Sequence, residues 1–131
     1  MPTILLIDDS RFMRMVNERA LSRAGYKVIG TEDGQKGLEL AKQHRPDLIL
    51  LDMLLPKMPG TEVLRQLKSD PQTSPIPVIV LTSLSEKNKE KLVRDGALDL
   101  LEKNDALLAR ESALLVEAVQ KAVGRAAGAG K

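Results

Sequence analysis

The run Leu48-Ile49-Leu50-Leu51-Asp52 carries the strongest fold signal in this chain. Its four consecutive apolar residues predict a strand buried on both faces, because a strand with one solvated face alternates apolar and polar residues. Strands of this kind are typical of parallel sheets that helices cover on both sides. The aspartate that follows the run puts a carboxylate at the end of such a strand.

Similar short apolar runs recur along the chain and alternate with stretches in which apolar residues follow a helical period. In the first such stretch Met13, Val16, Ala20 and Ala24 share a face, with Ser10 as a suitable N-cap and Gly25 as a stop. We expect strands at residues 4–7, 27–30, 48–51, 78–81 and 98–101. We expect helices after Ser10, over Gly34–His44, after Gly60, over Glu86–Asp95 and around Leu114–Val123.

Five repeats of strand and helix predict an α/β fold with a parallel sheet. Because crossover connections are right-handed, few topologies remain. We expect a doubly wound, flavodoxin-like sheet of five strands in the order 2-1-3-4-5, covered by five helices. We expect residues 1–125 to form this one domain and the small residues 126–131 to be a flexible tail or the stump of a linker.

The composition narrows the classes of protein to consider. The chain has 131 residues, is 43% hydrophobic and contains no cysteine, which excludes disulfides and thiolate metal sites. No apolar stretch is long enough to cross a membrane, and the first strand begins too early for a signal peptide, so a cytoplasmic location is expected. The 20 basic and 18 acidic residues are interspersed, which favours a mixed solvated surface over a nucleic-acid-binding face.

Polar residues follow the predicted strands at the edge where ligands bind in doubly wound sheets. Asp8 and Asp9 follow the first strand, Asp52 the third, Thr82 the fourth and Lys103 the fifth. Crowded carboxylates repel one another, and a hard divalent cation such as Mg²⁺ removes that repulsion. The hydroxyl and the ammonium group would bind the oxygens of a phosphoryl group transferred to a carboxylate.

These motifs resemble those of receiver domains from two-component response regulators, of the chemotaxis type that consists of a receiver alone. The resemblance covers about residues 3 to 124, and the motifs occur in the family's order and spacing. They are Ile7-Asp8-Asp9-Ser10, Leu50-Leu51-Asp52-Met53-Leu54-Leu55-Pro56, Met58-Pro59-Gly60, Ile76-Pro77-Val78-Ile79-Val80-Leu81-Thr82-Ser83 and Gly96-Ala97 to Lys103.

The resemblance implies a role for each matching residue. Asp52 would accept the phosphoryl group, and Mg²⁺ would be held by Asp8, Asp9, Asp52 and the backbone carbonyl of Leu54. Thr82 and Lys103 would bind the phosphate, with the backbone amides of Leu54 and Ser83, and Gly60 would allow a tight turn.

The resemblance also implies partners. A sensor histidine kinase or a phosphotransfer protein would be the donor, and an unidentified output protein would meet the fourth helix, fifth strand and fifth helix. The domain would be a monomer or would dimerise on activation.

The sequence departs from the family pattern at two places near Lys103. The residue after it is Asn104 instead of the usual proline, and a cis bond before a non-proline residue is unfavourable by about 2.5–4 kcal/mol. Leu100 stands where the family often has an aromatic switch residue. Leu54 and Leu84 are both apolar at positions that influence attack by water, so a long-lived phosphorylated state is expected.

Two other functions are compatible with parts of the sequence. Leu100 and Asn104 favour a pseudo-receiver, a protein-interaction module that no longer uses phosphate, whereas the complete set of site residues opposes it. A magnesium-dependent phosphohydrolase with Asp52 as nucleophile would need a second aspartate at position 54, where this chain has leucine. We therefore expect a signalling switch that catalyses only its own phosphorylation and dephosphorylation. DNA binding would require an output domain beyond these residues.

Overall fold

The computed structural model describes residues 2–53, 55, 57–82, 93–102 and 115–124. Strands and helices alternate along these residues, and the last described segment, 115–124, is helical. Within them, no helix is both long and apolar enough to span a bilayer. The elements are β1 (Thr3–Ile7), α1 (Arg11–Arg23), β2 (Lys27–Thr31), α2 (Gly34–His44), β3 (Leu48–Asp52), α3 (Gly60–Ser69), β4 (Val78–Thr82) and β5 (Asp99–Glu102).

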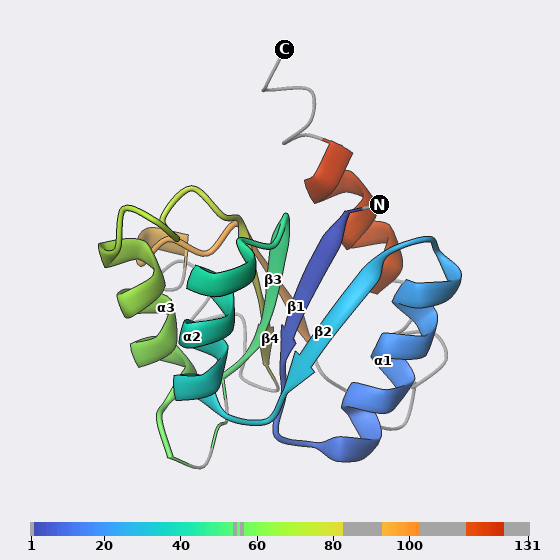
Figure 1. Ribbon diagram of the computed structural model, residues 1–131, viewed down its shortest axis with the longest axis horizontal. Helices are drawn as coiled ribbons and strands as arrows, with labels where there is room; N and C mark the ends of the chain where they lie inside the picture. The colour runs from blue at the N-terminus through green and yellow to red at the C-terminus, as the bar shows by residue number, and fades with distance from the viewer. Residues whose placement is uncertain (1, 54, 56, 83–92, 103–114, 125–131) are drawn as a thin grey trace.

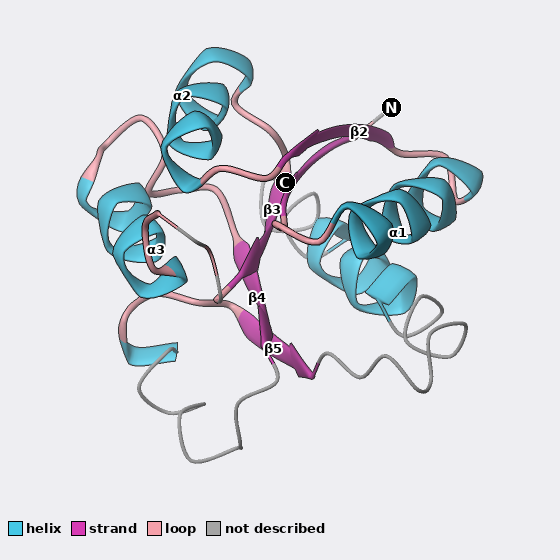
Figure 2. Cartoon of the chain, turned by 90° about the horizontal axis from the view of Figure 1, so that it is seen from below, coloured by secondary structure: helices cyan, strands magenta, loops and turns pink. Residues whose placement is uncertain are grey.

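The strands form one five-stranded sheet in the order β2-β1-β3-β4-β5, and every neighbouring pair is parallel. β1 and β3 lie in the interior of the sheet, as their continuous apolar runs require. α2 and α3 cover one face, while α1 and the helix 115–124 cover the other (Figures 1 and 2). This confirms the predicted fold class and strand order.

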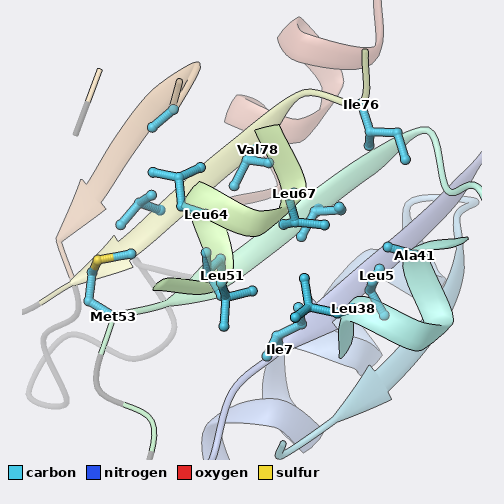
Figure 3. Packing of buried hydrophobic residues seen from close by; sticks show 14 residues of the cluster. Leu5, Ile7, Leu38, Ala41, Leu51, Met53, Leu64, Leu67, Ile76 and Val78 are labelled. Carbon is cyan, nitrogen blue, oxygen red and sulfur yellow. The ribbon is translucent and has the colours of Figure 1, made fainter. Parts of the chain in front are cut away.

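Each strand contributes alternate side chains to two separate cores. In β1, Leu5 and Ile7 pack in the core under α2 and α3, and Ile4 and Leu6 pack in the core on the opposite face. Figure 3 shows the first of these cores, in which Leu38 of α2 and residues of α3 meet the strands. The sheet is therefore buried on both faces, which keeps the strand ends as its accessible edge.

The ends of the predicted elements are close to those observed. The strand predicted at 98–101 is observed one residue later, at Asp99–Glu102. The backbone N–H of Leu98 already donates to Val78 O of β4, so the pairing starts at the predicted residue. Each of the other four strands gains one residue at one end. The helix predicted over Glu86–Asp95 lies outside the described residues except for its end.

α1 is capped at both ends by the residues that the sequence predicts, Ser10 and Gly25. The side chain of Ser10 accepts a hydrogen bond from the backbone N–H of Met13, which is the expected N-cap contact. At the other end Gly25 has a φ of 98°, and the N–H groups of Gly25 and Tyr26 donate to Ser22 O and Leu21 O. These two bonds form a Schellman motif, in which glycine adopts the left-handed conformation without strain.

The buried face of α1 differs from the predicted one. The fully buried residues of the helix are Met13, Asn17 and Leu21, which follow a four-residue spacing, whereas Val16 and Ala20 lie at the margin. Asn17 is 5% exposed, and among the described residues its side-chain amide has no hydrogen-bond partner. A polar group in this position destabilises the folded state by an amount on the order of 1–3 kcal/mol.

Replacing Asn17 by Leu is therefore expected to stabilise the protein by about 1 kcal/mol, because leucine has the same branching and needs no hydrogen bond. Urea denaturation followed by circular dichroism measures the change, which appears as a higher midpoint with an unchanged slope. Asn17→Ala controls for the loss of the amide without added volume. A lower midpoint in both variants would mean that the amide of Asn17 is satisfied.

Candidate metal centre

Three carboxylates meet where β1 and β3 end at the carboxyl edge of the sheet. Asp8 and Asp9 follow β1, and Asp52 is the last residue of the neighbouring β3. Their ligand oxygens all lie within 4.8 Å of one another. Asp8 is fully buried and Asp52 is 2% exposed, whereas Asp9 is exposed to solvent. The cluster thus has two buried carboxylates and one that opens it to the exterior.

Hydrogen bonds on either side hold Asp8 in place. Its backbone N–H donates to Thr31 O of β2 at 3.0 Å, which extends the parallel pairing by one residue. Its side-chain Oδ1 accepts from the N–H of Ser10 at 3.0 Å, and its carbonyl oxygen accepts from Arg14 Nη1 at 2.8 Å. The Asp8 carboxylate is consequently oriented by the same turn that begins α1.

Asp52 is positioned by the end of β3 and by the start of α3. Asp52 pairs in register with Leu81 of β4, and the next N–H, of Met53, donates to Leu81 O at 3.0 Å. The N–H of Gly60 then donates to Met53 O at 3.0 Å. A Cβ at Gly60 would lie 2.5 Å from Met53 Cα and 2.6 Å from Asp52 O. The backbone that carries Asp52 therefore rests directly against the first turn of α3.

The resemblance implied that Gly60 allows a tight turn into the third helix, and the structure gives the physical reason for a glycine there. Gly60 is not among the described residues with positive φ, and it is the first residue of α3. The glycine is needed because backbone atoms come too close for any side chain.

The donor set of the cluster matches a hard divalent cation. Carboxylate oxygens are the protein ligands that Mg²⁺ and Ca²⁺ prefer, and cysteine and histidine, which favour softer metals, are absent from the cluster. Mg²⁺ usually takes one or two carboxylates and keeps several waters, so a cluster with one exposed side suits it. The residues present therefore fit the predicted ion.

The structure adds a pocket next to the cluster that sequence reasoning missed. The pocket has a volume of about 180 Å³ and is lined by Asp9, Glu32, Asp33, Gly34 and Lys57. Asp33 also caps α2, because its Oδ1 accepts from the N–H of Gln35 at 2.8 Å. Glu32 and Asp33 follow β2, so the argument that strand ends meet at one edge would have found them. No feature of the sequence indicated that Lys57 would line this pocket.

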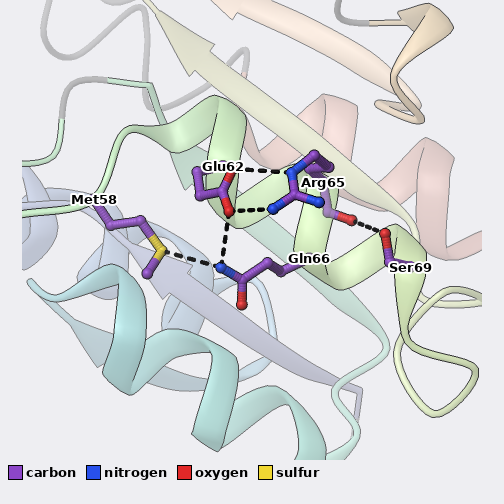
Figure 4. Close-up of polar contacts among 5 residues, drawn as sticks. All are labelled: Met58, Glu62, Arg65, Gln66 and Ser69. Carbon is purple, nitrogen blue, oxygen red and sulfur yellow. Dashed lines mark hydrogen bonds and ion pairs between the residues drawn. The ribbon is translucent and has the colours of Figure 1, made fainter.

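Side-chain hydrogen bonds perturb titratable groups along α3 (Figure 4). Hydrogen bonds from Arg65 and Gln66 lower the pKa of Glu62, and the bond to Glu62 raises the pKa of Arg65. Burial lowers the pKa of Lys68, whose ammonium group donates to Ser74 O at 3.0 Å and Ile76 O at 2.7 Å. These contacts tie α3 to itself and to the loop before β4, which is a structural role.

The structure brings together part of the predicted site. Asp8, Asp9 and Asp52 form the cluster, and the backbone of Thr82 ends β4 beside them, paired with Glu102. The Thr82 side chain is not described, and Leu54, Ser83, Leu84, Lys103 and Asn104 lie outside the described residues. The predicted roles of these residues remain predictions.

Comparisons with known proteins agree on one family. The sequence pattern of the response regulator receiver domain matches residues 4–111. The chain is 35% identical over 97 residues to the polar-differentiation response regulator DivK of Brucella anthropi, covering 74% of this chain and 79% of DivK. It is 43% identical over 119 residues to the DNA-binding dual master transcriptional regulator RpaA of Synechocystis, covering 88% of this chain but only 49% of RpaA.

Solved structures give the same result. The chemotaxis response regulator CheY4 of Vibrio cholerae superposes with a TM-score of 0.84 at 28% identity, over 93% of this chain and 98% of CheY4. The Mn²⁺-bound form of response regulator Rcp1 superposes with a TM-score of 0.76 at 28% identity, over 87% of this chain and 91% of Rcp1.

Proposed function

This chain belongs to the response regulator receiver family, whose members are phosphorylation-controlled switches in two-component signalling, and we propose that it accepts a phosphoryl group on Asp52. One observation carries the assignment to this residue: Asp52 is buried at the end of a central strand with the oxygens of Asp8 and Asp9 within 4.8 Å. The exposed side of the cluster, at Asp9, leaves an approach for a donor.

In the proposed reaction a carboxylate oxygen of Asp52 forms a bond to phosphorus. The bond from phosphorus to a histidine nitrogen of the donor breaks, and that nitrogen keeps the electron pair and takes a proton from solvent. A bound divalent cation supplies positive charge that offsets the carboxylates and the phosphoryl oxygens. Asp8, Asp9, Asp52 and the carbonyl of Leu54 would hold that cation, while Thr82 and Lys103 would bind the remaining phosphoryl oxygens.

Addition of Mg²⁺ is expected to stabilise the protein, because an ion that binds only the folded state shifts the unfolding equilibrium. At a free concentration of one hundred times Kd the gain is about 2.7 kcal/mol. Thermal unfolding with increasing Mg²⁺ measures it, and Asp9→Ala should remove most of the shift. Asp95→Ala, the same change at an exposed residue in another part of the molecule, is the matched control. An equal shift in Asp9→Ala and wild type would contradict the site. The Mn²⁺-bound state of Rcp1 supports this proposal.

Phosphoryl loss from Asp52 is expected to be slow, since Leu54 and Leu84 are apolar and would exclude water from the acyl phosphate. Leu54→Asn should accelerate the loss, because an amide can orient an attacking water. The decay of the phosphorylated mass with time, with and without the substitution, measures the two rates. Equally fast decay in both proteins would overturn this explanation.

The main alternative is a pseudo-receiver that binds partners without phosphate, which Leu100 and Asn104 favour. Incubation with Mg²⁺ and a small phosphodonor such as phosphoramidate, followed by intact mass measurement, distinguishes the two. One added phosphoryl group supports the switch. If there is no adduct and no binding of a beryllofluoride mimic, the pseudo-receiver is favoured. Turnover of a phosphate ester would instead indicate a phosphohydrolase, which the leucine at position 54 opposes.

We further propose a cytoplasmic location, a histidine kinase or phosphotransfer protein as donor, and an output protein that meets the fourth helix, β5 and the last helix. The chain spans about half of RpaA, so DNA binding is not transferred from that relative to this domain. Phosphorylation would shift an existing equilibrium between two conformations, since a modification acts by stabilising one of them. Dimerisation on activation would be one consequence of that shift.

A further inference from the structure

The side chain of Arg14 reaches from α1 back to the carboxyl edge of the sheet. Its Nη1 donates at 2.8 Å to Asp8 O, the carbonyl of the peptide that joins Asp8 to Asp9. α1 contains four arginines, and Arg14 is the one that is only partly exposed. The contact is not needed to begin the helix, because the side chain of Ser10 already accepts from the N–H of Met13. Arg14 is instead bound to the peptide that carries two of the three clustered carboxylates.

Hydrogen bonds hold both backbone polar groups of Asp8 but leave the Asp9 carboxylate without a direct contact. The N–H of Asp8 donates to Thr31 O, and its carbonyl accepts from Arg14. Among the described residues, no hydrogen bond or ion pair reaches the carboxylate of Asp9, which is exposed. A peptide unit is planar, so fixing the carbonyl of Asp8 also limits where the Cα of Asp9 can lie. The position of Asp9 therefore depends on Arg14.

A glycine in the neighbouring strand leaves room for this side chain. Gly30 lies within β2 and pairs in register with Leu6 of β1. Glycine weakens the interior of a strand, and it often marks a place where other atoms approach closely. A Cβ at position 30 would lie 3.2 Å from Arg14 Cδ and would collide with the carboxylate of Glu18. The stem of Arg14 thus lies against β2 at the residue that has no side chain.

We propose that Arg14 is a positioning residue for the candidate metal centre, where it holds the Asp8–Asp9 peptide and thereby the Asp9 carboxylate. The inference rests on the proposed function, in which the cluster binds Mg²⁺. That ion requires nearly ideal octahedral geometry, so a displaced carboxylate weakens its binding. Residues that hold metal ligands by hydrogen bonds typically change metal affinity by about 10–100-fold. Arginine suits this task, because its planar group carries several donors in a fixed arrangement.

The charge of Arg14 acting alone would have the opposite effect on the ion. A guanidinium group near the cluster repels an incoming Mg²⁺ ion, so a variant without this charge would bind the ion more tightly if charge were decisive. If Arg14 only stabilised the start of α1, its replacement would lower the free energy of unfolding and leave the Mg²⁺ affinity of the folded protein unchanged. Of the three roles, only positioning predicts weaker binding of the ion in a folded variant.

Isothermal titration calorimetry of the full chain with Mg²⁺ measures the affinity in each variant. Arg14→Met keeps a long side chain without donors and should bind Mg²⁺ about tenfold more weakly than wild type. Arg14→Lys retains a donor group that can reach the carbonyl and should bind Mg²⁺ more tightly than Arg14→Met. Arg19→Met, the matched control, makes the same change at an exposed arginine of α1 and should leave the affinity unchanged. Circular dichroism checks that each variant is folded.

Three results would overturn the proposal. Equal Mg²⁺ affinity in Arg14→Met and wild type would restrict Arg14 to the stability of α1, and tighter binding in Arg14→Met would mean that its charge is decisive. If Arg14→Met does not fold, Arg14→Gln, whose shorter side chain falls short of the carbonyl, takes its place with the same expected loss. The third result is a wild type that does not bind Mg²⁺. It would contradict the proposed metal site as well, whereas the first two results leave that site intact.

Discussion

Replacing Asp52 by Asn is expected to abolish uptake of a phosphoryl group, reducing the adduct from most of the protein to none. Asparagine has nearly the same shape, so the fold is kept, but its amide cannot act as the nucleophile that forms an acyl phosphate. Intact mass after incubation with Mg²⁺ and phosphoramidate measures the effect. Wild type should gain the mass of one phosphoryl group, and Asp52→Asn should gain none.

The control for this experiment is Asp95→Asn, which makes the same chemical change at an exposed residue near α3. It should take up phosphoryl groups at the rate of wild type. A persistent adduct in Asp52→Asn would contradict the assignment, because it would mean that another residue, such as Asp9, is the acceptor. Asp52 is proposed both to accept the phosphoryl group and to bind the ion. Titrating Asp52→Asn with Mg²⁺ measures the second role separately, since an unphosphorylated protein can still bind the ion.

Gly60→Ala is expected to cause the largest loss of stability among single methyl additions. The new Cβ would lie 2.5 Å from Met53 Cα and 2.6 Å from Asp52 O, and neither backbone atom can rotate away. The start of α3 and the end of β3 must then separate, at a loss of about 1–3 kcal/mol in the free energy of unfolding. Phosphoryl uptake should fall as well, because the same shift displaces Asp52 from Asp8 and Asp9.

Gly124→Ala is the matched control for this prediction. Its added Cβ would meet nothing within 4 Å, and it lies in the helix 115–124. There alanine should stabilise by up to about 1 kcal/mol through its higher helix propensity. Urea denaturation of both variants measures the contrast. If Gly60→Ala unfolds at the wild-type midpoint, the backbone at Met53 can move freely and the close packing has no effect on the site.

The fold could be predicted because each signal for it is local. The apolar runs of β1, β3 and β4 have no polar alternation, which indicates strands buried on both faces, and the Ser10 and Gly25 contacts of α1 involve residues close in sequence. The clustering of Asp8, Asp9 and Asp52 followed from the same reasoning, since parallel neighbours end at one edge.

Sequence reasoning missed the features that depend on contacts between residues far apart in the chain. A helical pattern assigns Asn17 to a face only approximately, and its burial depends on where α1 packs against the sheet. Glu32 and Lys57 line one pocket because two loops far apart in the chain meet there. Position 60 requires glycine because the backbone of Met53 lies against it. The residues next to Gly60 in the sequence do not indicate this contact.

The sequence by itself therefore determined the order of strands and helices, the parallel sheet and the edge where the carboxylates gather, because hydrophobic periodicity and strand direction are properties of short segments. Only the tertiary structure decided that Gly60 must have no side chain, that Asn17 is buried and that Arg14 contacts the carbonyl of Asp8. Each of these depends on the atoms that another segment brings within contact distance, and packing between segments is settled only when the whole sheet and its helices are assembled.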